Sequence, residues 1–368
     1  MSRKILFLAG SPSDAFHAEL SRVYATDCLE ALAGVAGDDW TVAWFSPDRT
    51  VCFPSRLQPS EISRARRYSL VQACQHIVAS KFDVAVPQMF CPAGMTDYRS
   101  LLETLGVPVV GNTAVTMANT MDKATARAIA TAAGIPMPRG KAVEQLDPGD
   151  HELPVVIKPA RADNSQGVSL VRRADELCKA FEIAKQYDDK VIVEQFIPLG
   201  REVRCATLYR GGKIECLPLQ EYCLDASAVP IRDEASKLLR TPDGSIDLTS
   251  KHHPTSSIVD VDDPVTKAVW TVARQCHQAF GCRDYGLFDF RIDPEGQPYF
   301  LEAGLYCSFA PKSIVVAVAE AAGISLPELF DHCIDMAIQR RSPALPNTNR
   351  FEGPHSVTGE TPGVAVST

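Results

Sequence analysis

Residues 287–304 constrain the fold most, because they form two runs of alternating residues joined by a turn at Pro294-Glu-Gly-Gln297. A hairpin with a loop of two or four residues places Asp289 directly opposite Glu302, and opposed residues on one face lie about 5 Å apart at Cβ. Two carboxylates that close repel each other unless a cation lies between them. The hairpin therefore predicts a magnesium site. For this segment alone, an exposed hairpin with scattered acids is an equally good interpretation.

The apolar residues of the same hairpin predict its buried face. Successive side chains of a strand point to opposite faces, so a hairpin with one acidic face has a second face of its own. We expect the second face to be packed while the acidic face looks into a cleft. The packed face is expected to carry Phe288, Phe290, Ile292, Tyr299 and Leu301.

The length and composition are those of an ordinary globular protein with more than one core. A chain of 368 residues suggests two or three subdomains, and a hydrophobic fraction of 45% with a charged fraction of 22% is typical of globular domains. The net charge of −8 and the absence of a basic run argue against a nucleic-acid partner and against anionic membrane surfaces. No apolar run approaches the roughly 20 residues that span a bilayer.

The start of the chain and its cysteines indicate a cytoplasmic protein. The apolar run at residues 4–9 is too short for a signal peptide and is followed at once by Gly10-Ser-Pro-Ser-Asp14, so we expect a buried first strand. The 12 cysteines are dispersed and form no Cys-x-x-Cys pair or zinc-spaced cluster, which favours reduced, buried thiols.

Strand-like and helix-like segments alternate through the first part of the chain. This alternation predicts an open α/β domain over residues 1–112. The expected strands are residues 4–9, 40–45, 84–87 and 107–110, and the expected helices are residues 19–33, 72–80 and 95–105.

The rest of the chain predicts two further subdomains and a tail. A long helical region ending at Gly134 opens a central subdomain over residues 113–202, and residues 203–340 form a C-terminal subdomain with a mobile loop at 223–257. Residues 341–368 are rich in Pro, Ser, Thr, Gly and Asn and are expected to be disordered. The expected strands are residues 155–158, 168–171, 191–194, 203–209 and 214–218, and the expected helices are residues 175–187, 264–280, 312–322 and 326–340.

A lysine at the end of a short apolar strand is a candidate phosphate ligand. Lys158 is followed by a loop of small residues that contains Asn164, Ser165 and Gly167, and such a loop can present backbone N–H groups to phosphate. The order Gly-Lys-Ser/Thr of a Walker loop is missing. Taken alone, this segment is better explained as an ordinary surface turn.

The strand Val191–Ile197 is a candidate wall for a nucleotide base. A base stacked in an apolar slot needs aliphatic walls and an acceptor at its edge. Glu194 and the backbone near Phe196 and Ile197 would provide these, and Glu202 would bind ribose hydroxyls. A buried strand with one solvated acid is the favoured interpretation of this segment on its own.

The order of these features is more specific than any one of them. A lysine on a helix, a lysine before a glycine-containing loop, an acid-bearing strand and an Asp/Glu hairpin together resemble the ATP-grasp superfamily. They resemble the D-alanine–D-alanine ligases more closely, over roughly residues 3–338. The landmarks are Met121-Asp-Lys123, Lys158-Pro159, Glu194, Glu202, Asp289, Glu302 and Ser313.

This resemblance implies an ATP-grasp fold of mixed α/β and α+β class, with an N-terminal open α/β domain, a small central subdomain over ATP and a C-terminal metal-binding subdomain. It implies ATP as the nucleotide and Mg²⁺ as the ion, with Mn²⁺ as an alternative. The implied ligands are Lys123 and Lys158 for the phosphates, Glu194 for adenine, Glu202 for ribose, and Asp289 and Glu302 for the metal.

The same resemblance extends to residues that would act on the substrates. Lys237 matches the lysine of a mobile loop that closes on the γ-phosphate. Glu19, followed by Ser21, matches the acid that receives the ammonium group of the first substrate. Ser313 is a further catalytic candidate, and a homodimer is expected because dipeptide ligases of this type are commonly dimers.

Three positions depart from the dipeptide ligases. Leu287 stands where they carry an arginine, Gly304 where they carry a metal-binding asparagine, and Ser308 where a glycine faces the developing oxyanion. Losing one donor to a tetrahedral acyl intermediate costs about 2.7–4 kcal/mol of transition-state stabilisation. The departures therefore indicate either an inactive enzyme or activation of something other than a simple carboxylate.

Four segments are similar to the ligases of mycosporine biosynthesis, which resemble dipeptide ligases but join an amino acid to mycosporine-glycine. These enzymes also share the unusual Glu-Ala-Gly of residues 302–304. The resemblance implies an ATP-dependent ligase that uses an amine such as serine or threonine and releases ADP and phosphate. The segments are Val86–Arg99, Arg201–Cys205, Leu217–Tyr222 and Leu301–Ser313.

Substrate contacts are expected from two segments. Arg99 could pair with a substrate carboxylate in a bidentate manner, and the loop with Tyr306 and Ser308 could line the pocket for the polar ring. Lys312 and Ser313, entering a helix, could receive the carboxylate of the incoming amino acid. For Arg99 and Tyr306, a surface ion pair and a packed ring are equally good interpretations.

Two other functions remain open at this point. One is a D-alanine–D-alanine ligase or another dipeptide ligase, against which Leu287 and Gly304 count. The other is a non-catalytic ATP-binding scaffold, which the altered metal and oxyanion positions would also fit.

Overall fold

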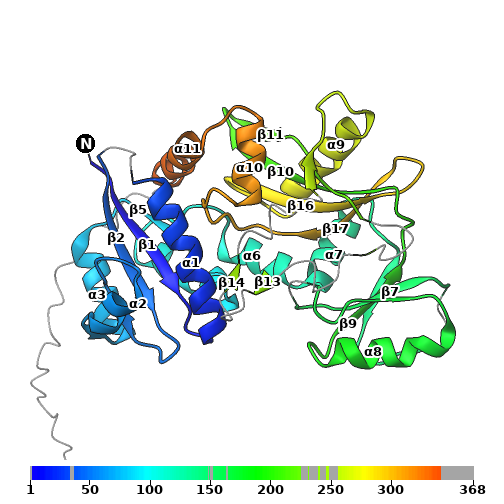
Figure 1. Ribbon diagram of the computed structural model, residues 1–368, viewed down its shortest axis with the longest axis horizontal. Helices are drawn as coiled ribbons and strands as arrows, with labels where there is room; N and C mark the ends of the chain where they lie inside the picture. The colour runs from blue at the N-terminus through cyan, green and yellow to red at the C-terminus, as the bar shows by residue number, and fades with distance from the viewer. Residues whose placement is uncertain are drawn as a thin grey trace, which may run out of the picture.

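The computed structural model describes residues 2–33, 37–147, 149, 152–162, 165–224, 231, 239–240, 246–247 and 256–340. Figure 1 shows an N-terminal sheet at the left, a second sheet with its helix at the lower right, and a third sheet above it. The mixed α/β class expected from the sequence is confirmed. Within the described part of the chain, no helix is long and apolar enough to cross a bilayer.

The N-terminal sheet is built around a buried central strand. Strand β1 (Lys4–Gly10) pairs in parallel with β2 (Asp39–Phe45) and β5 (Val84–Pro87), as the alternation of strands and helices predicts. The strand order is β4-β3-β2-β1-β5, with β3 (Val51–Cys52) and β4 (Arg67–Tyr68) antiparallel. The helices are α1 (Ala15–Ala31), α2 (Pro59–Arg64), α3 (Leu70–Ser80), α4 (Pro92–Met95) and α5 (Asp97–Thr104). The strand expected at 107–110 is reduced to one bridge between Ala85 and Val109.

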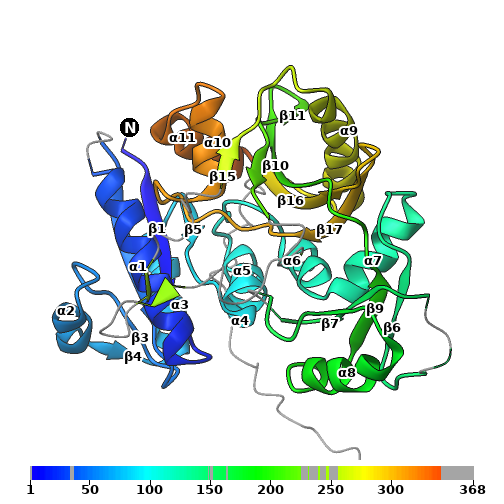
Figure 2. The same ribbon diagram turned by 45° about the vertical axis from the view of Figure 1, so that its right-hand side comes forward.

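The second sheet is small and antiparallel. Its strand order is β6-β9-β7-β8, and helix α8 packs against β7, β8 and β9 through Leu177, Phe181 and Ala184 (Figure 2). Three of the strands were expected from the sequence, and β6 was not. The bounds are β6 (Gly140–Val143), β7 (Val155–Pro159), β8 (Ser169–Val171), α8 (Leu177–Lys185) and β9 (Val191–Gln195), with a short 3₁₀ turn at Ala174–Glu176.

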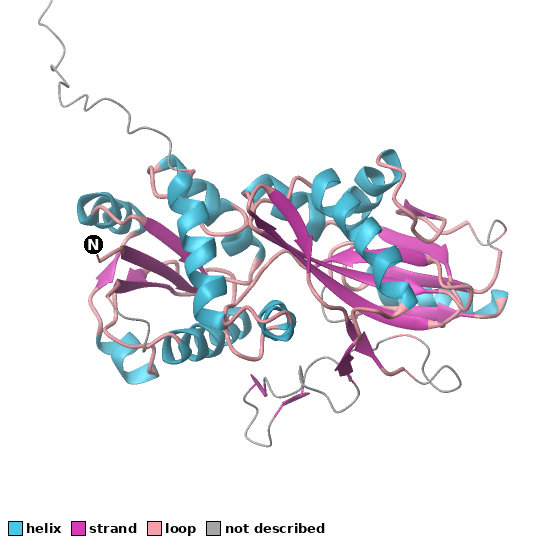
Figure 3. Cartoon of the chain, turned by 90° about the horizontal axis from the view of Figure 1, so that it is seen from above, coloured by secondary structure: helices cyan, strands magenta, loops and turns pink. Residues whose placement is uncertain are grey.

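The third sheet carries the acidic hairpin. Its order is β15-β12-β10-β16-β17, with β11 paired to β10, and Figure 3 shows it set apart from the N-terminal sheet along the long axis. The strands are β10 (Arg201–Arg210), β11 (Lys213–Cys216), β12 (Gln220–Tyr222), β15 (Ser256–Ile258), β16 (Tyr285–Ile292) and β17 (Pro298–Ala303). The helices of this part are α9 (Pro264–Ala279), α10 (Ile314–Ala321) and α11 (Leu326–Gln339), and a separate short pair is formed by β13 (Leu239–Arg240) and β14 (Ile246–Asp247).

The long helical region expected before Gly134 is two helices, because Asp122 interrupts it. Asp122 has an extended backbone (ψ 102°), and its carboxylate accepts hydrogen bonds from the N–H groups of Ala124 and Thr125. Helix α6 (Ala114–Met121) ends before it, and α7 (Lys123–Ala132) begins after it. The break places Lys123 at the first position of α7, where its Nζ atom donates a hydrogen bond to the backbone carbonyl of Ala162 at 2.6 Å.

The acidic hairpin has the expected register at its acidic pair but not beyond it. Asp289 lies opposite Glu302, which confirms the prediction. The register then shifts by one residue, so that Phe290 pairs with Phe300. The expectation that Tyr299 and Leu301 lie on the packed face is therefore wrong, because the irregularity turns Phe300 into the core and Tyr299 toward Arg291.

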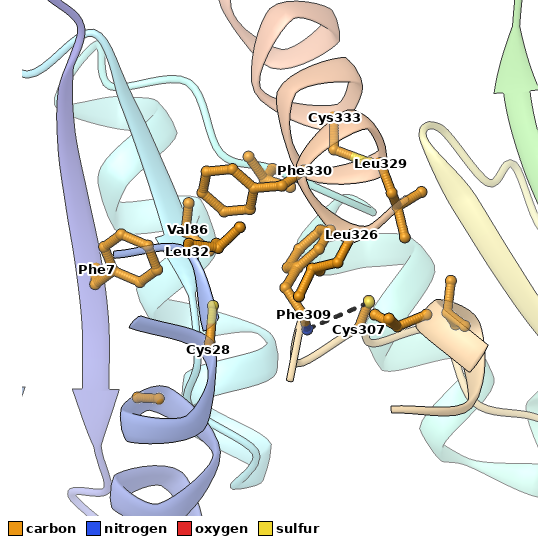
Figure 4. Packing of buried hydrophobic residues seen from close by; sticks show 14 of the residues in the cluster. Phe7, Cys28, Leu32, Val86, Cys307, Phe309, Leu326, Leu329, Phe330 and Cys333 are labelled. Atoms are coloured by element: carbon orange, nitrogen blue, oxygen red, sulfur yellow. Dashed lines mark hydrogen bonds between the residues drawn. The ribbon is translucent and has the colours of Figure 1, made fainter. Parts of the chain in front are cut away.

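One apolar core joins the N-terminal sheet to the C-terminal helices. Figure 4 shows Phe7 of β1, Phe330 of α11 and Phe309 of the loop after β17 in this cluster. The rings of Phe7 and Phe330 stack with centroids 6.2 Å apart, and Phe309 meets Phe330 edge-on at 5.4 Å. This core fixes the loop that follows the acidic hairpin.

A buried asparagine ties the linker after residue 110 to the third sheet. The side-chain amide of Asn112 donates hydrogen bonds to the backbone carbonyls of Tyr285 and Leu305, at 2.9 and 3.1 Å. Its side-chain carbonyl accepts a hydrogen bond from the backbone N–H of Arg283 at 2.8 Å. These three bonds hold two sheets and the loop after β17 in one arrangement.

We expect Asn112→Ala to lower the free energy of unfolding by about 3 kcal/mol, because it leaves two buried backbone carbonyls and one partly buried backbone N–H unsatisfied at roughly 1–3 kcal/mol each. Denaturant titration followed by circular dichroism measures the change. The control is Thr104→Ala, since the exposed Thr104 hydroxyl bonds only within α5. A loss no larger than that of the control would contradict the bridging role.

Candidate active site

A pocket between the second and third sheets brings together most of the residues expected to bind nucleotide and metal. Strands β7 and β9 form one wall, and β10, β16 and β17 form the other. The start of α7 contributes Lys123. The expected residues that line the pocket are Lys123, Lys158, Ser165, Glu194, Phe196, Ile197, Glu202, Asp289 and Glu302.

Two cross-strand ion pairs lie on the wall that β10 and β16 form, and Glu202, Asp289 and Arg291 of these pairs line the pocket. In the antiparallel register of β10 and β16, Glu202 lies opposite Arg291 and Arg204 lies opposite Asp289. Both pairs close at 2.8 Å, and their side chains are at most 15% exposed. Opposite charges at directly opposed positions stabilise a sheet, and burial keeps their attraction strong.

The charge of Arg204 is favoured by its surroundings. Burial opposes the charged form, but the negative charges of Asp289 and Glu302 and the neighbouring Tyr222 raise the pKa of Arg204 above its usual value. Its guanidinium also lies 5.2 Å from the centre of the Tyr222 ring. Arg204 therefore remains a fixed cation beside the two acids of the hairpin.

Asp289 and Glu302 form the candidate metal site. Carboxylate oxygens are the ligands that Mg²⁺ prefers, and it is commonly held by one or two carboxylates together with substrate phosphates and water. The Nζ atom of Lys123 lies 3.7 Å from a carboxylate oxygen of Glu302. Among the described residues, no cluster of three or more His, Cys, Asp or Glu could hold a metal by itself. The two acids thus fit an ion whose remaining ligands come from phosphate oxygens and water.

Gly304 leaves space beside the metal site. A Cβ atom built on Gly304 would meet only Leu287 Cδ2, at 3.9 Å. The backbone surroundings of Gly304 therefore leave room for a Cβ atom.

Glu194 holds the two cations of the opposite wall. One oxygen lies 2.5 Å from Nζ of Lys158, and the other lies 2.7 Å from a guanidinium nitrogen of Arg127. Arg127 also donates to the backbone carbonyl of Pro138 at 2.7 Å. The Lys158 side chain is 11% exposed and lines the pocket, so a ligand bound in the pocket would lie next to it.

Part of the pocket lining is apolar. Its aliphatic and aromatic residues come from β7, β17, the segment after β9 and the segments just before β6 and β8. The guanidinium carbons of Arg172 and Arg291 lie 5.7 and 5.9 Å from the centre of the Phe196 ring. The lining residues are Pro138, Val156, Val168, Phe196, Ile197 and Leu301.

Two expected residues lie outside the part of the chain that the structure describes. These are Asn164 of the loop after β7 and Lys237 of the segment 223–257. The neighbouring Ser165 is described, has a positive φ of 60° and lines the pocket.

Arg99 has a structural position that differs from the expected one. It is 2% exposed, and its guanidinium donates hydrogen bonds to the backbone carbonyls of Val110 and Asn112, both at 3.1 Å. It does not line the nucleotide pocket. A buried guanidinium held by backbone carbonyls has no surface to offer a substrate, so we assign Arg99 to the support of the linker in place of the expected substrate contact.

The remaining candidates gather beside helix α1, away from the nucleotide pocket. The ring of Phe90 lies 5.2 Å from Tyr24 of α1 and 5.5 Å from Tyr306, whose side chain is 40% exposed. On α1, the carboxylate of Glu19 forms an ion pair with Arg22 at 2.6 Å.

The loop after Tyr306 leads into helix α10. The backbone carbonyl of Ser308 accepts a hydrogen bond from Gln88 at 2.8 Å. Ser313 precedes the first residue of α10, its hydroxyl lies 3.8 Å from Cys307 Sγ, and Lys312 beside it is half-buried. Among these positions, only Tyr306 presents a large exposed ring.

Three arginines of the site were not among the expected residues. Arg204 follows Glu202 by two positions and Arg291 follows Asp289 by two positions, so each shares a strand face with an expected ligand. This separation of two positions was the sequence signal that could have identified Arg204 and Arg291. Arg127 is one helical turn after Lys123 on α7, and nothing in the sequence pairs it with Glu194.

Comparison with known proteins identifies relatives over most of the chain. Residues 101–335 match the family described as "D-ala D-ala ligase C-terminus". The chain is 32% identical over 323 residues to a D-alanine–D-alanine ligase of Mycolicibacterium vanbaalenii, covering 84% of this chain and 81% of that protein.

Solved structures show the same fold. The VanG D-Ala:D-Ser ligase from Enterococcus faecalis superimposes with a TM-score of 0.74 at 21% identity, covering 92% of this chain and 100% of that one. A D-alanine–D-alanine ligase from Bacillus anthracis complexed with ATP superimposes with a TM-score of 0.65 at 18% identity, covering 92% and 99%.

We expect Lys158→Met to weaken ATP binding by roughly 10- to 100-fold, because a hydrogen bond to a charged group is worth about 1.5–3 kcal/mol. Isothermal titration calorimetry with Mg-ATP measures the affinity. The matched control is Lys179→Met, because Lys179 is exposed on α8 and does not line the pocket. Equal affinities for the two variants would contradict the assignment of this pocket to nucleotide.

Proposed function

This chain belongs to the D-alanine–D-alanine ligase family, and from that premise we propose that it joins an amino acid to mycosporine-glycine at the expense of ATP. Its class is that of an ATP-dependent, ADP-forming carbon–nitrogen ligase. Enzymes of the family use ATP and Mg²⁺. Membership of a ligase family favours catalysis over the non-catalytic scaffold.

The observation that carries the proposal is a pair of apolar residues next to the metal site. Along the paired strands β10 and β16, the ion pair of Arg204 and Asp289 is followed by the pair of Ala206 and Leu287. Leu287 is 8% exposed and belongs to the apolar core that joins the two ends of the chain. An arginine at this position would bury a charge in that core.

The apolar pair of Ala206 and Leu287 argues against acyl transfer. A tetrahedral acyl intermediate needs donors, and the loss of one costs about 2.7–4 kcal/mol of transition-state stabilisation. Leu287 offers no donor, and Gly304 offers no third side-chain ligand to the metal although there is room for a Cβ atom there. A substrate that develops its charge elsewhere removes the need for both.

Mycosporine-glycine provides such a substrate. Its ring carries an enaminone, a vinylogous amide whose carbonyl oxygen is electron-rich. In the proposed reaction that oxygen takes the γ-phosphoryl group of ATP and ADP leaves. The amine of the amino acid then adds to the activated ring carbon, phosphate departs with the former carbonyl oxygen, and loss of protons from nitrogen gives the imine.

The residues of the pocket have distinct roles in this proposal. Asp289 and Glu302 would hold Mg²⁺, which neutralises phosphate charge. Lys123 and Lys158 would bind phosphate oxygens, and Glu202 the ribose. Lys237, which lies outside the described residues, would close on the γ-phosphate and help to exclude water.

The second substrate would lie toward α1 in this proposal. Tyr306 presents an exposed ring beside Phe90, which suits the flat face of the mycosporine ring. Lys312 and Ser313 at the start of α10 would receive the carboxylate of the amino acid, and Glu19 on α1 would lie on the opposite side.

A second candidate function is the joining of two amino acids, as in a D-alanine–D-alanine ligase. The observation that favours it is the name of the relatives: the matched protein of Mycolicibacterium vanbaalenii is a D-alanine–D-alanine ligase, and VanG is a D-Ala:D-Ser ligase. Those names support this candidate more directly than the mycosporine reaction. The site of this chain, with Leu287 and Gly304, supports it less.

One assay separates the two candidates. We expect the protein with Mg-ATP, mycosporine-glycine and serine or threonine to form a product whose mass is the sum of both substrates less one water, with one ADP per product. Mass spectrometry and an ADP assay measure this, with D-alanine alone as the parallel incubation. Formation of D-alanyl-D-alanine, with no product from mycosporine-glycine across a panel of amines, would establish the second candidate instead.

A further inference from the structure

We propose that Arg204 is a resident counterion of the metal site, which occupies Asp289 until a divalent ion arrives together with ATP and which then binds phosphate oxygens. The inference rests on the proposed function, because it takes Asp289 and Glu302 as the metal ligands. It adds a positioning residue and an order of binding that the family relationship does not supply.

The contact between Arg204 and Asp289 engages both oxygens of the carboxylate. The Nε atom of Arg204 lies 2.8 Å from Oδ1 and 2.9 Å from Oδ2 of Asp289. The two side chains are 15% and 10% exposed. A divalent ion that binds Asp289 must therefore compete with a buried, charge-assisted hydrogen bond.

The position of Arg204 in the sheet brings its side chain next to Asp289 when no ligand is bound. Arg204 and Asp289 are directly opposed in the register of β10 and β16, so their side chains emerge on the same face. The ring of Tyr222, on the neighbouring strand β12, lies 5.2 Å from the guanidinium carbon and limits its motion on that side. The pair is a product of strand pairing and does not depend on a loop.

The acids of the pocket already have basic partners in this state. Glu302 faces Lys123, Glu202 faces Arg291, and Glu194 lies between two cations. Within the described residues, each acid of the site therefore has at least one basic partner. The pairs are Lys123–Glu302, Arg127–Glu194, Lys158–Glu194, Arg204–Asp289 and Arg291–Glu202.

A pocket whose acids are already paired with basic residues binds a free divalent ion poorly. The ion would bring two positive charges beside Arg204 and Lys123, which already neutralise its two ligands, and repulsion between charges about 4 Å apart amounts to several kcal/mol at a partly buried site. A triphosphate changes this balance, because its oxygens offer new partners to both cations. The planar guanidinium of Arg204 matches phosphate oxygens in geometry as well as in charge.

Arg291 provides a matched control for this role. It lies on the strand paired with that of Arg204, its ion pair with Glu202 has the same length of 2.8 Å, and its side chain is also buried. Its partner Glu202 is expected at the ribose. Glu202 lies on β10, outside the hairpin in which Asp289 is opposite Glu302. Removing Arg291 takes away the same charge without uncovering the metal ligands.

The experiment measures Mn²⁺ binding by electron paramagnetic resonance for the full chain, with and without a non-hydrolysable ATP analogue. The variants are Arg204→Met, Arg204→Lys and Arg291→Met. For the wild type, we expect Mn²⁺ to bind at least about 10-fold more tightly with the analogue than alone. For Arg204→Met, Mn²⁺ alone should bind about 10-fold more tightly than to the wild type, and the analogue should bind about 10-fold more weakly.

Arg204→Lys keeps the positive charge but loses the planar guanidinium. Its affinity for Mn²⁺ alone should therefore exceed that of the wild type by roughly three-fold. It carries the test if Arg204→Met does not fold. Arg291→Met should bind Mn²⁺ alone as the wild type does. A merely structural arginine would leave the affinity for Mn²⁺ alone unchanged in all variants.

The failures of the two proposals are distinguishable. If the wild type takes up Mn²⁺ with the analogue but the Arg204 variants gain no affinity for Mn²⁺ alone, the counterion role is overturned and the proposed function stands. The counterion role is likewise overturned if Arg291→Met gains as much affinity as Arg204→Met. If the wild type takes up no Mn²⁺ even with the analogue, the metal site of the proposed function is itself refuted.

Discussion

The pairing of opposite charges across strands β10, β16 and β17 is the interaction on which the site depends. Four residues of these strands (Glu202, Arg204, Asp289 and Arg291) form two directly opposed ion pairs, and Glu302 lies opposite Asp289 on the third strand. Unpaired, each of these buried charges would raise the free energy of the folded chain by several kcal/mol. Paired, they hold the proposed metal ligand Asp289 and the proposed ribose ligand Glu202 in place.

Strands β10 and β16 also explain why the site ends where it does. Their shared face passes from ion pairs to the apolar pair of Ala206 and Leu287, and then to Leu208 and Tyr285 within the core beneath the N-terminal sheet. The end with the ion pairs is charged because it faces the second sheet across a pocket. The other end is apolar because helices α10 and α11 and strand β1 cover it. A change of chemistry along one strand face thus follows from what packs on it.

The sequence predicted the features that depend on local periodicity. The opposition of Asp289 and Glu302, the lysine at the end of β7 and the buried strand β1 follow from alternation and from turn residues. The shift of register that sends Phe300 into the core follows from no local signal, and it made the expected packed face wrong at Tyr299 and Leu301. The break at Asp122 was missed because both helices around it have the same period.

Partners separated along the chain were beyond the reach of sequence alone. Arg99 looked like a carboxylate ligand, and only the folded backbone shows the two carbonyls that bind it. Arg204 and Asp289 are 85 residues apart, so their pairing required the order of strands in the third sheet. Residues on one strand face are predictable from spacing, whereas the identity of the opposing strand is a property of the tertiary structure.

A crystal structure with Mn²⁺ and a non-hydrolysable ATP analogue tests the central claim most directly, because anomalous scattering locates the ion without reference to the protein. The account predicts one strong peak between the carboxylates of Asp289 and Glu302, in contact with the terminal phosphates of the analogue in the pocket between the second and third sheets. A nucleotide bound elsewhere, or a manganese peak that touches neither carboxylate, would contradict it.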